Sequence, residues 1–186
     1  MSSTWNLSLT RRECYAALGV AAAAAPALTA TSLKPMRGAF MILSTPYTAS
    51  GQVDWEDLGR EAEFVDRCGA QGMLWPQGSS GVAFLSREER MRGMDLLAKA
   101  MRGKRSALAL GVQSKDIDEM LIYAHRAEEM APNCLIAMPP STGKSQEDCR
   151  AYFQALAKTT AGPVIMQTSE RRARSLDQHL GGVRCQ

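Results

Sequence analysis

The feature that most constrains the fold of this chain is a regular alternation of short apolar runs and longer amphipathic segments from Arg37 onward. Uniformly apolar runs of this length are typical of parallel strands buried on both faces, and the segments between them have helical periodicity. The sequence therefore predicts an α/β fold in which strand and helix alternate with a period of roughly 30 residues. The expected strands are 38–43, 72–76, 107–112, 134–138 and 163–166.

Polar residues mark where the helices between these strands should begin. Asp54, Ser114 and Ser145 can each cap a helix, and Ser86 with Glu89 three residues later predicts a capping box. A doubly wound sheet and a barrel both fit this pattern, and both bind ligands beyond the carboxyl ends of their strands. The expected buried helix faces are Leu58, Ala62 and Val65; Met94, Leu97 and Met101; Ile117, Leu121 and Ala124; and Tyr152, Phe153 and Leu156.

Residues 1–30 form a leader that we expect to be separate from this domain. Arg11 and Arg12 precede a run of small apolar residues, and Pro26 to Ala30 close the leader with further small residues. This order indicates a cleavable signal peptide, and the arginine pair is similar to the twin-arginine export motif. The apolar run is shorter than the roughly 20 residues that span a bilayer. We therefore expect export to the periplasm, with an alanine-rich first helix of a cytoplasmic protein as the alternative.

Residues 169–186 have no apolar periodicity, which predicts an irregular tail after a domain that spans residues 31–168. The formal charge of +3 comes from the leader and this tail, so the domain itself is neutral. Phosphate binding needs a basic face, and the neutral domain therefore argues against nucleic acid as a partner. The five cysteines and two histidines lack the spacing of metal ligands, so we expect neither a metal site nor a cofactor.

The best candidate for chemistry is Gly78-Ser79-Ser80-Gly81, the loop after the second expected strand. Glycine-flanked hydroxyls at a strand end offer backbone N–H groups and two side-chain donors to a small carboxylate. A loop that needs glycine and serine only for flexibility is the simpler alternative. The glycine-containing segment around Lys144 lacks the first glycine of a P-loop and follows two prolines, which argues against nucleotide binding.

The segment from Gly78 to Arg90 resembles a signature of the dihydrodipicolinate synthase and N-acetylneuraminate lyase family. It contains Gly-Ser-Ser-Gly and then Leu-Ser-Arg-Glu-Glu-Arg, in the order of that signature. The resemblance runs from about Arg37 to Gln167. Weaker similarity to the family is found at Thr45-Pro46, Val53-Asp54 and Leu110-Gly111-Val112.

This resemblance implies a (β/α)8 TIM barrel, of which the sequence supplies about five βα units, and a lyase or aldolase that acts on a 2-oxo acid such as pyruvate. In the family a lysine on the sixth strand forms a Schiff base with the substrate, and tyrosines after the fourth and fifth strands assist in acid–base steps. The hydroxyl pair, here Ser79 and Ser80, binds the carboxylate, and Ser79 relays a proton. Thr45, Gly78 and Gly81 complete the implied substrate site.

The sequence departs from the family pattern at the positions that carry chemistry. Val82 replaces the usual glutamate, Pro140 and Ser141 stand where a tyrosine is usual, and Met166-Gln167 replace a Tyr-Asn pair. No lysine matches the Schiff-base nucleophile, so we expect the chain to be catalytically inactive. The alternative is a non-catalytic half-barrel that binds a small carboxylate and forms a homo-oligomer through the unpaired edge of its fifth strand.

Overall fold

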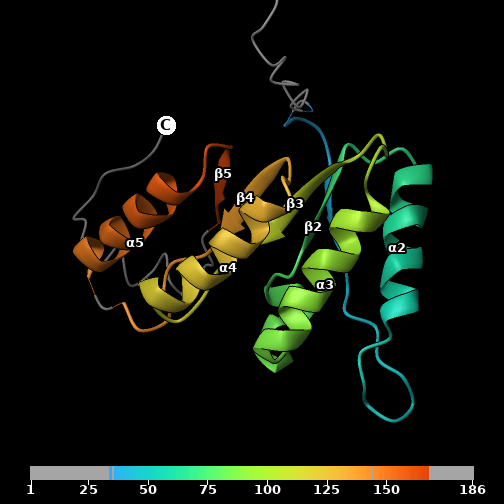
Figure 1. Ribbon diagram of the computed structural model, residues 1–186, viewed down its shortest axis with the longest axis horizontal. Coiled ribbons are helices and arrows are strands. Elements are labelled where there is room, and N and C mark those ends of the chain that lie inside the picture. The colour runs from blue at the N-terminus through green and yellow to red at the C-terminus, as the bar shows by residue number, and fades with distance from the viewer. Residues whose placement is uncertain (1–33, 35, 144, 168–186) are drawn as a thin grey trace, which may run out of the picture. The chain divides into compact units, whose positions relative to one another are not determined.

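The computed structural model describes residues 34, 36–143 and 145–167, where parallel strands alternate with helices (Figure 1). The strands are β1 Phe40–Ile42, β2 Gly72–Trp75, β3 Ala107–Gly111, β4 Cys134–Ala137 and β5 Val164–Met166. The helices are α2 Trp55–Arg67, α3 Arg87–Ala100, α4 Ile117–Glu129 and α5 Gln146–Thr159. The predicted leader, with Arg11 and Arg12, and the predicted tail lie outside the described residues, so both stay predictions.

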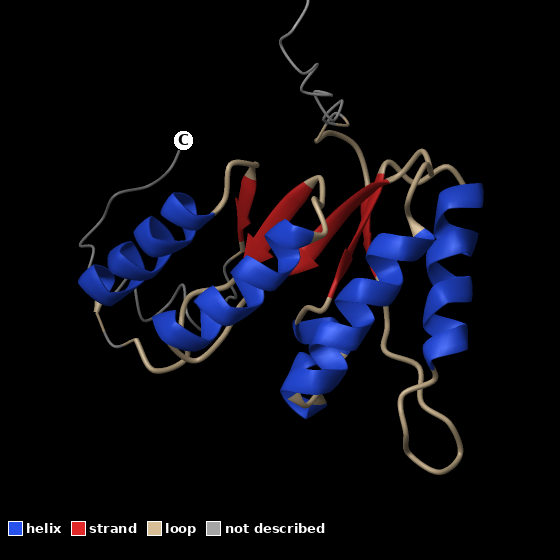
Figure 2. Cartoon of the chain, in the orientation of Figure 1, coloured by secondary structure: helices blue, strands red, loops and turns tan. Residues whose placement is uncertain are grey.

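Strand order decides between the two architectures that the sequence allowed. The five strands form one sheet in the order β1-β2-β3-β4-β5, and every neighbouring pair is parallel. A doubly wound sheet reverses its strand order at a switch point, and no reversal occurs here. Because parallel crossovers are right-handed, an order that advances in one direction places all the helices on one face of the sheet. Figure 2 shows the helices together in front of the strands, as in a barrel.

The alternation of side chains along the strands divides the core into two layers. One side of the sheet packs against the helices, and Met73, Trp75, Leu108, Leu110 and Leu135 lie on this side. Leu74, Ala109, Cys134 and Ile136 form a second buried cluster on the opposite side. The register explains this division, because it pairs Leu74 with Ala109 and Trp75 with Leu110 in adjacent strands.

The expectation that every strand is buried on both faces is confirmed for β2, β3 and β4, whose residues are all buried. It is wrong for the two edge strands. Met41 in β1 is 48% exposed, and Met166 in β5 is 65% exposed. The reason is that each edge strand has only one neighbour within the described residues, so one side of its backbone and side chains lacks cover.

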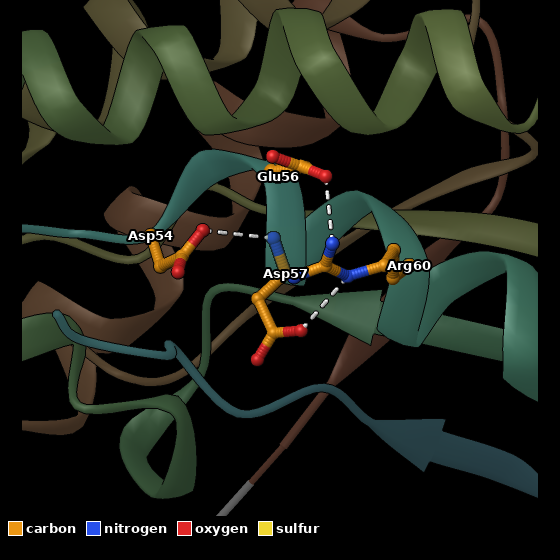
Figure 3. A network of polar contacts seen from close by, with 4 residues as sticks. All are labelled: Asp54, Glu56, Asp57 and Arg60. Atoms are coloured by element: carbon orange, nitrogen blue, oxygen red, sulfur yellow. Dashed lines mark hydrogen bonds and ion pairs between the residues drawn. The ribbon is translucent and has the colours of Figure 1, made fainter.

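The predicted helix starts at Asp54, Ser86 and Ser145 are confirmed, the last two as capping boxes. Figure 3 shows the start of α2, where the Asp54 carboxylate accepts a hydrogen bond from the backbone N–H of Asp57 at 3.0 Å. Arg60 donates to Glu56 at 2.6 Å and to Asp57 at 3.1 Å. These ion pairs are exposed and contribute little, so the cap and the buried face of α2 hold this helix in place.

The expected start of α4 at Ser114 is wrong. Asp116 caps this helix and accepts a hydrogen bond from the Glu119 N–H at 2.9 Å, while the Ser114 hydroxyl contacts the Glu119 carboxylate. The buried face also differs from the expectation, because Ile117 and Leu121 are only partly buried. The residues that α4 buries are Met120, Tyr123, Ala124 and Ala127.

Candidate functional site

The candidate loop forms a compact turn beyond the carboxyl end of β2, and we call Gly78–Gly81 the hydroxyl loop. Its centre is the Gln77 carbonyl, which accepts hydrogen bonds from the N–H of Ser80 at 3.0 Å and of Val82 at 3.3 Å. Gly81 has a φ of 75°, in the left-handed region that favours glycine. The chain can therefore turn sharply here, from the short 3₁₀ helix η1 (Gly78–Ser80) into η2 (Val82–Phe84).

Hydroxyl groups attach the hydroxyl loop to the end of β1. The buried Ser80 Oγ donates to the carbonyl of Leu43 at 2.6 Å, and Thr45 Oγ1 donates to the carbonyl of Ser80 at 2.5 Å. Thr45 Oγ1 also accepts a hydrogen bond from Trp75 Nε1 at 3.0 Å. The donor hydrogens of Ser80 and Thr45 are thus already used inside the protein, and both residues hold the loop in place.

The structure brings together all the substrate-site residues that the sequence predicted: Thr45, Gly78, Ser79, Ser80 and Gly81. Within the described part of the chain, Ser79 alone of the three hydroxyl residues is exposed and has no hydrogen bond from its side chain. Its hydroxyl is therefore the group in this set that is free to donate to a ligand.

Two glutamines attach the hydroxyl loop to β3, a contact that sequence reasoning missed. Gln77 Nε2 donates to Gln113 Oε1 at 3.2 Å, and Gln113 Nε2 donates to the carbonyl of Pro76 at 2.7 Å. The only signal in the sequence was that each is a polar residue just beyond an apolar strand. That signal does not indicate that the two side chains meet.

A buried arginine supports the same end of β3. Arg90 in α3 is 5% exposed, and its Nη2 donates to the carbonyls of Gly111 at 3.2 Å and Gln113 at 3.0 Å. Its guanidinium carbon lies 3.7 Å from the centre of the Tyr123 ring, a cation–π contact. Burial lowers the pKa of Arg90, and the neighbouring Tyr123 and Glu119 oppose this shift. The family signature contained this arginine, but its contacts with β3 needed the tertiary structure.

The positions that depart from the family pattern surround the ends of β4 and β5. Pro140 is buried, Ser141 is exposed, and Met166 lies largely in solvent. The backbone N–H of Gln167 donates to the carbonyl of Ala137 at 2.9 Å, which continues the pairing of β5 with β4. Neither a thioether nor a primary amide exchanges protons near neutral pH, so the end of β5 carries no acid–base group.

The described residues offer little other chemistry. Burial raises the pKa of the Cys134 thiol to about 12, so this cysteine stays protonated and unreactive. Among residues 34, 36–143 and 145–167, no group of histidine, cysteine and acidic side chains could hold a metal ion. No helix within the same ranges is long and apolar enough to cross a membrane. Lys144 lies outside the described residues.

Comparison with known proteins gives one consistent result. The model of the dihydrodipicolinate synthetase family matches residues 35–176. The 4-hydroxy-tetrahydrodipicolinate synthase of Agrobacterium fabrum is 28% identical over 132 residues, which cover 70% of this chain and 44% of that protein. The corresponding enzyme of Bartonella bacilliformis is 27% identical over 133 residues and is covered over 45% of its length. The chain thus spans a little under half the length of these curated relatives.

Solved structures show the same fold. The dihydrodipicolinate synthase of Agrobacterium tumefaciens aligns with a TM-score of 0.64 at 27% identity, over 70% of this chain and 44% of that chain. A prophage protein of the dihydrodipicolinic acid synthase family from E. coli K12, solved in complex with pyruvate, aligns with a TM-score of 0.66 at 20% identity over the same shares. The similarity to the second structure concerns the fold alone.

Proposed function

Because the chain belongs to the dihydrodipicolinate synthetase family, we propose that its hydroxyl loop binds the carboxylate of a small 2-oxo acid such as pyruvate. The observation that carries this proposal is the division of labour among the three hydroxyls. Ser80 and Thr45 fix the loop, and the Ser79 hydroxyl remains exposed and free within the described residues. A pre-ordered donor loses little conformational freedom when it binds a charged acceptor.

We also propose that the protein descends from lyases or aldolases, but not that it carries out their complete reaction. The family relationship supports an origin among lyases and aldolases that form or cleave carbon–carbon bonds on a 2-oxo acid through an imine. Met166 and Gln167 cannot move a proton at the end of β5. We therefore propose that this chain binds the acid without the covalent step.

Titration of the full chain with pyruvate should show saturable binding, and Ser79→Ala should weaken it by about tenfold or more. The reason is that a hydrogen bond to a charged carboxylate is worth about 1.5–3 kcal/mol. Isothermal titration calorimetry measures both affinities. The matched control is Ser50→Ala, because Ser50 is an exposed serine in the β1–α2 loop whose hydroxyl contacts Thr48 instead of the hydroxyl loop.

Treatment with borohydride in the presence of pyruvate should leave the mass of the same protein unchanged. An imine would be reduced to a permanent adduct, which intact-mass spectrometry detects. Absence of pyruvate binding in a folded sample would contradict the binding proposal. A single adduct on one lysine would instead show a working covalent step and overturn the second part of the proposal.

A second candidate function is a half-barrel that dimerises through its sheet edge, favoured by the exposure of Met166 on β5. Sedimentation equilibrium should then give the mass of a dimer, and Met166→Lys should shift the equilibrium toward the monomer, because a charged lysine on an edge strand opposes pairing. Phe64→Lys on α2 is the control, since Phe64 is also exposed but lies on the helix layer. A wild-type chain that sediments as a monomer at all concentrations would exclude this candidate.

A further inference from the structure

Two buried amide side chains connect the hydroxyl loop with β3. Gln77 is fully buried and Gln113 is 6% exposed. They form a chain of hydrogen bonds from Gln77 Nε2 to Gln113 Oε1, and from Gln113 Nε2 to the carbonyl of Pro76. Both glutamines lie beyond the carboxyl ends of β2 and β3, and Gln77 directly precedes the hydroxyl loop. We call Gln77 and Gln113 the amide pair.

The Pro76 carbonyl fixes the orientation of both amide groups. The Pro76 carbonyl can only accept, so Gln113 must turn its NH₂ group toward it and its oxygen toward Gln77. Gln77 must then turn its own NH₂ group toward Gln113. Its Oε1 is left buried and without a hydrogen-bond partner among the described residues. An unpaired buried acceptor is unfavourable, and the amide pair nevertheless keeps this single orientation because the Pro76 carbonyl requires it.

Arg90 fixes the backbone at Gln113, one of the two residues of the amide pair. Its guanidinium donates to the backbone carbonyls of Gly111 and Gln113, and it stacks on Tyr123 in the next helix. The backbone from which the Gln113 side chain extends is therefore fixed from the helix layer. Side-chain freedom at Gln113 is also small, because both ends of its amide are hydrogen-bonded.

A displacement of Gln77 would also displace Ser79. The Gln77 carbonyl accepts from the N–H of Ser80 and of Val82, so this residue anchors the turn that contains Ser79. On its other side, the loop is held to β1 through Leu43 and Thr45. The hydroxyl loop is thus fixed between its two neighbouring strands, and the amide pair supplies the side-chain attachment to β3.

We propose that Gln77 and Gln113 are positioning residues, which hold Ser79 where it can donate to the carboxylate and thereby set the affinity for the acid. This inference rests on the proposed function. Neither amide needs to contact the ligand. Both act through the position of the hydroxyl loop, and they act in series, since the amide of Gln77 reaches β3 only through Gln113.

Gln113→Met and Gln77→Met should each weaken pyruvate binding by about tenfold, and the double variant should be no weaker than Gln113→Met alone. The reason is that Gln113→Met already breaks both hydrogen bonds of the amide pair, so the two effects on affinity are not additive. Hydrogen–deuterium exchange gives an independent measure of the loop. The N–H groups of Ser80, Gly81 and Val82 are hydrogen-bonded within the turn, and they should exchange faster in all three variants.

Ser106→Ala is the matched control. Ser106 is a buried polar residue that lies just before β3, at the opposite end of the strand, and its Oγ donates to the carbonyl of Ala70 at 2.7 Å. Its removal costs one buried hydrogen bond, as in Gln77→Met, but should change neither the exchange of the hydroxyl loop nor the affinity for pyruvate. Gln77→Met also removes the buried Oε1 that has no partner, which offsets part of the lost hydrogen bond. This variant should therefore stay folded even if Gln113→Met does not.

Unchanged affinity in both folded single variants, or additive losses in the double variant, would overturn the inference while the proposed function stands. If the wild-type chain fails to bind pyruvate, the proposed function has failed, and hydrogen exchange then decides the positioning role. Faster exchange confined to the hydroxyl loop would support that role. Exchange equal to that of the wild type would overturn it.

Discussion

Gly111→Ala should lower the free energy of unfolding by about 3 kcal/mol, near the upper end of typical overpacking costs, and should displace the hydroxyl loop. A Cβ atom at this position would lie 1.9 Å from the carbonyl oxygen of Pro76 and 3.0 Å from its carbonyl carbon. These are backbone atoms next to the neighbouring strand, so no side-chain rotation relieves the clash. The same carbonyl accepts from Gln113, so the substitution also disturbs the amide pair.

Urea denaturation followed by circular dichroism measures this loss. Gly59→Ala is the matched control, because Gly59 lies inside α2 and the nearest atom to its added Cβ would be Leu96 Cδ2 at 3.6 Å. Alanine is favoured over glycine inside a helix by about 1 kcal/mol, so the control should be neutral or stabilising. A loss below about 1 kcal/mol for Gly111→Ala would show that β2 and β3 can separate at this point without the expected strain.

Gly93→Ala should destabilise the chain by about 2 kcal/mol, and the same substitution should cost much less in a chain that carries Trp75→Phe. An added Cβ on Gly93 would lie 2.2 Å from Cη2 of the Trp75 indole. That ring cannot move aside, since it is fully buried and its Nε1 is hydrogen-bonded to Thr45. Phenylalanine lacks the outer ring atoms that meet the new methyl group.

A double-mutant cycle tests this contact. Trp75→Phe alone should be destabilising, because it leaves a cavity and removes the hydrogen bond to Thr45. In the Gly93→Ala background the same substitution should be much less costly, with a coupling energy of at least about 1 kcal/mol. Additive losses would contradict the close approach of α3 to β2. The result also bears on the site, because Trp75 and Thr45 support the attachment of the hydroxyl loop to β1.

The sequence alone determined the order and type of the elements. Apolar runs gave the five strands, helical spacing gave α2 to α5, and Asp54, Ser86 and Ser145 marked three helix starts correctly. These features are local, since capping and periodicity depend on residues within a few positions of one another. The glycine–serine motif, read through the family resemblance, also located the hydroxyl loop at the carboxyl end of β2.

The tertiary structure decided which hydroxyls are free and what holds them. The sequence does not distinguish Ser79 from Ser80, yet only Ser80 donates a hydrogen bond to the carbonyl of Leu43, 37 positions away. The exposure of Met41 on β1 and the contact between Gln77 and Gln113 across 36 positions were likewise invisible beforehand. The physical reason is that such contacts arise when strands distant in sequence become neighbours in the sheet, and no local pattern records which polar groups then meet.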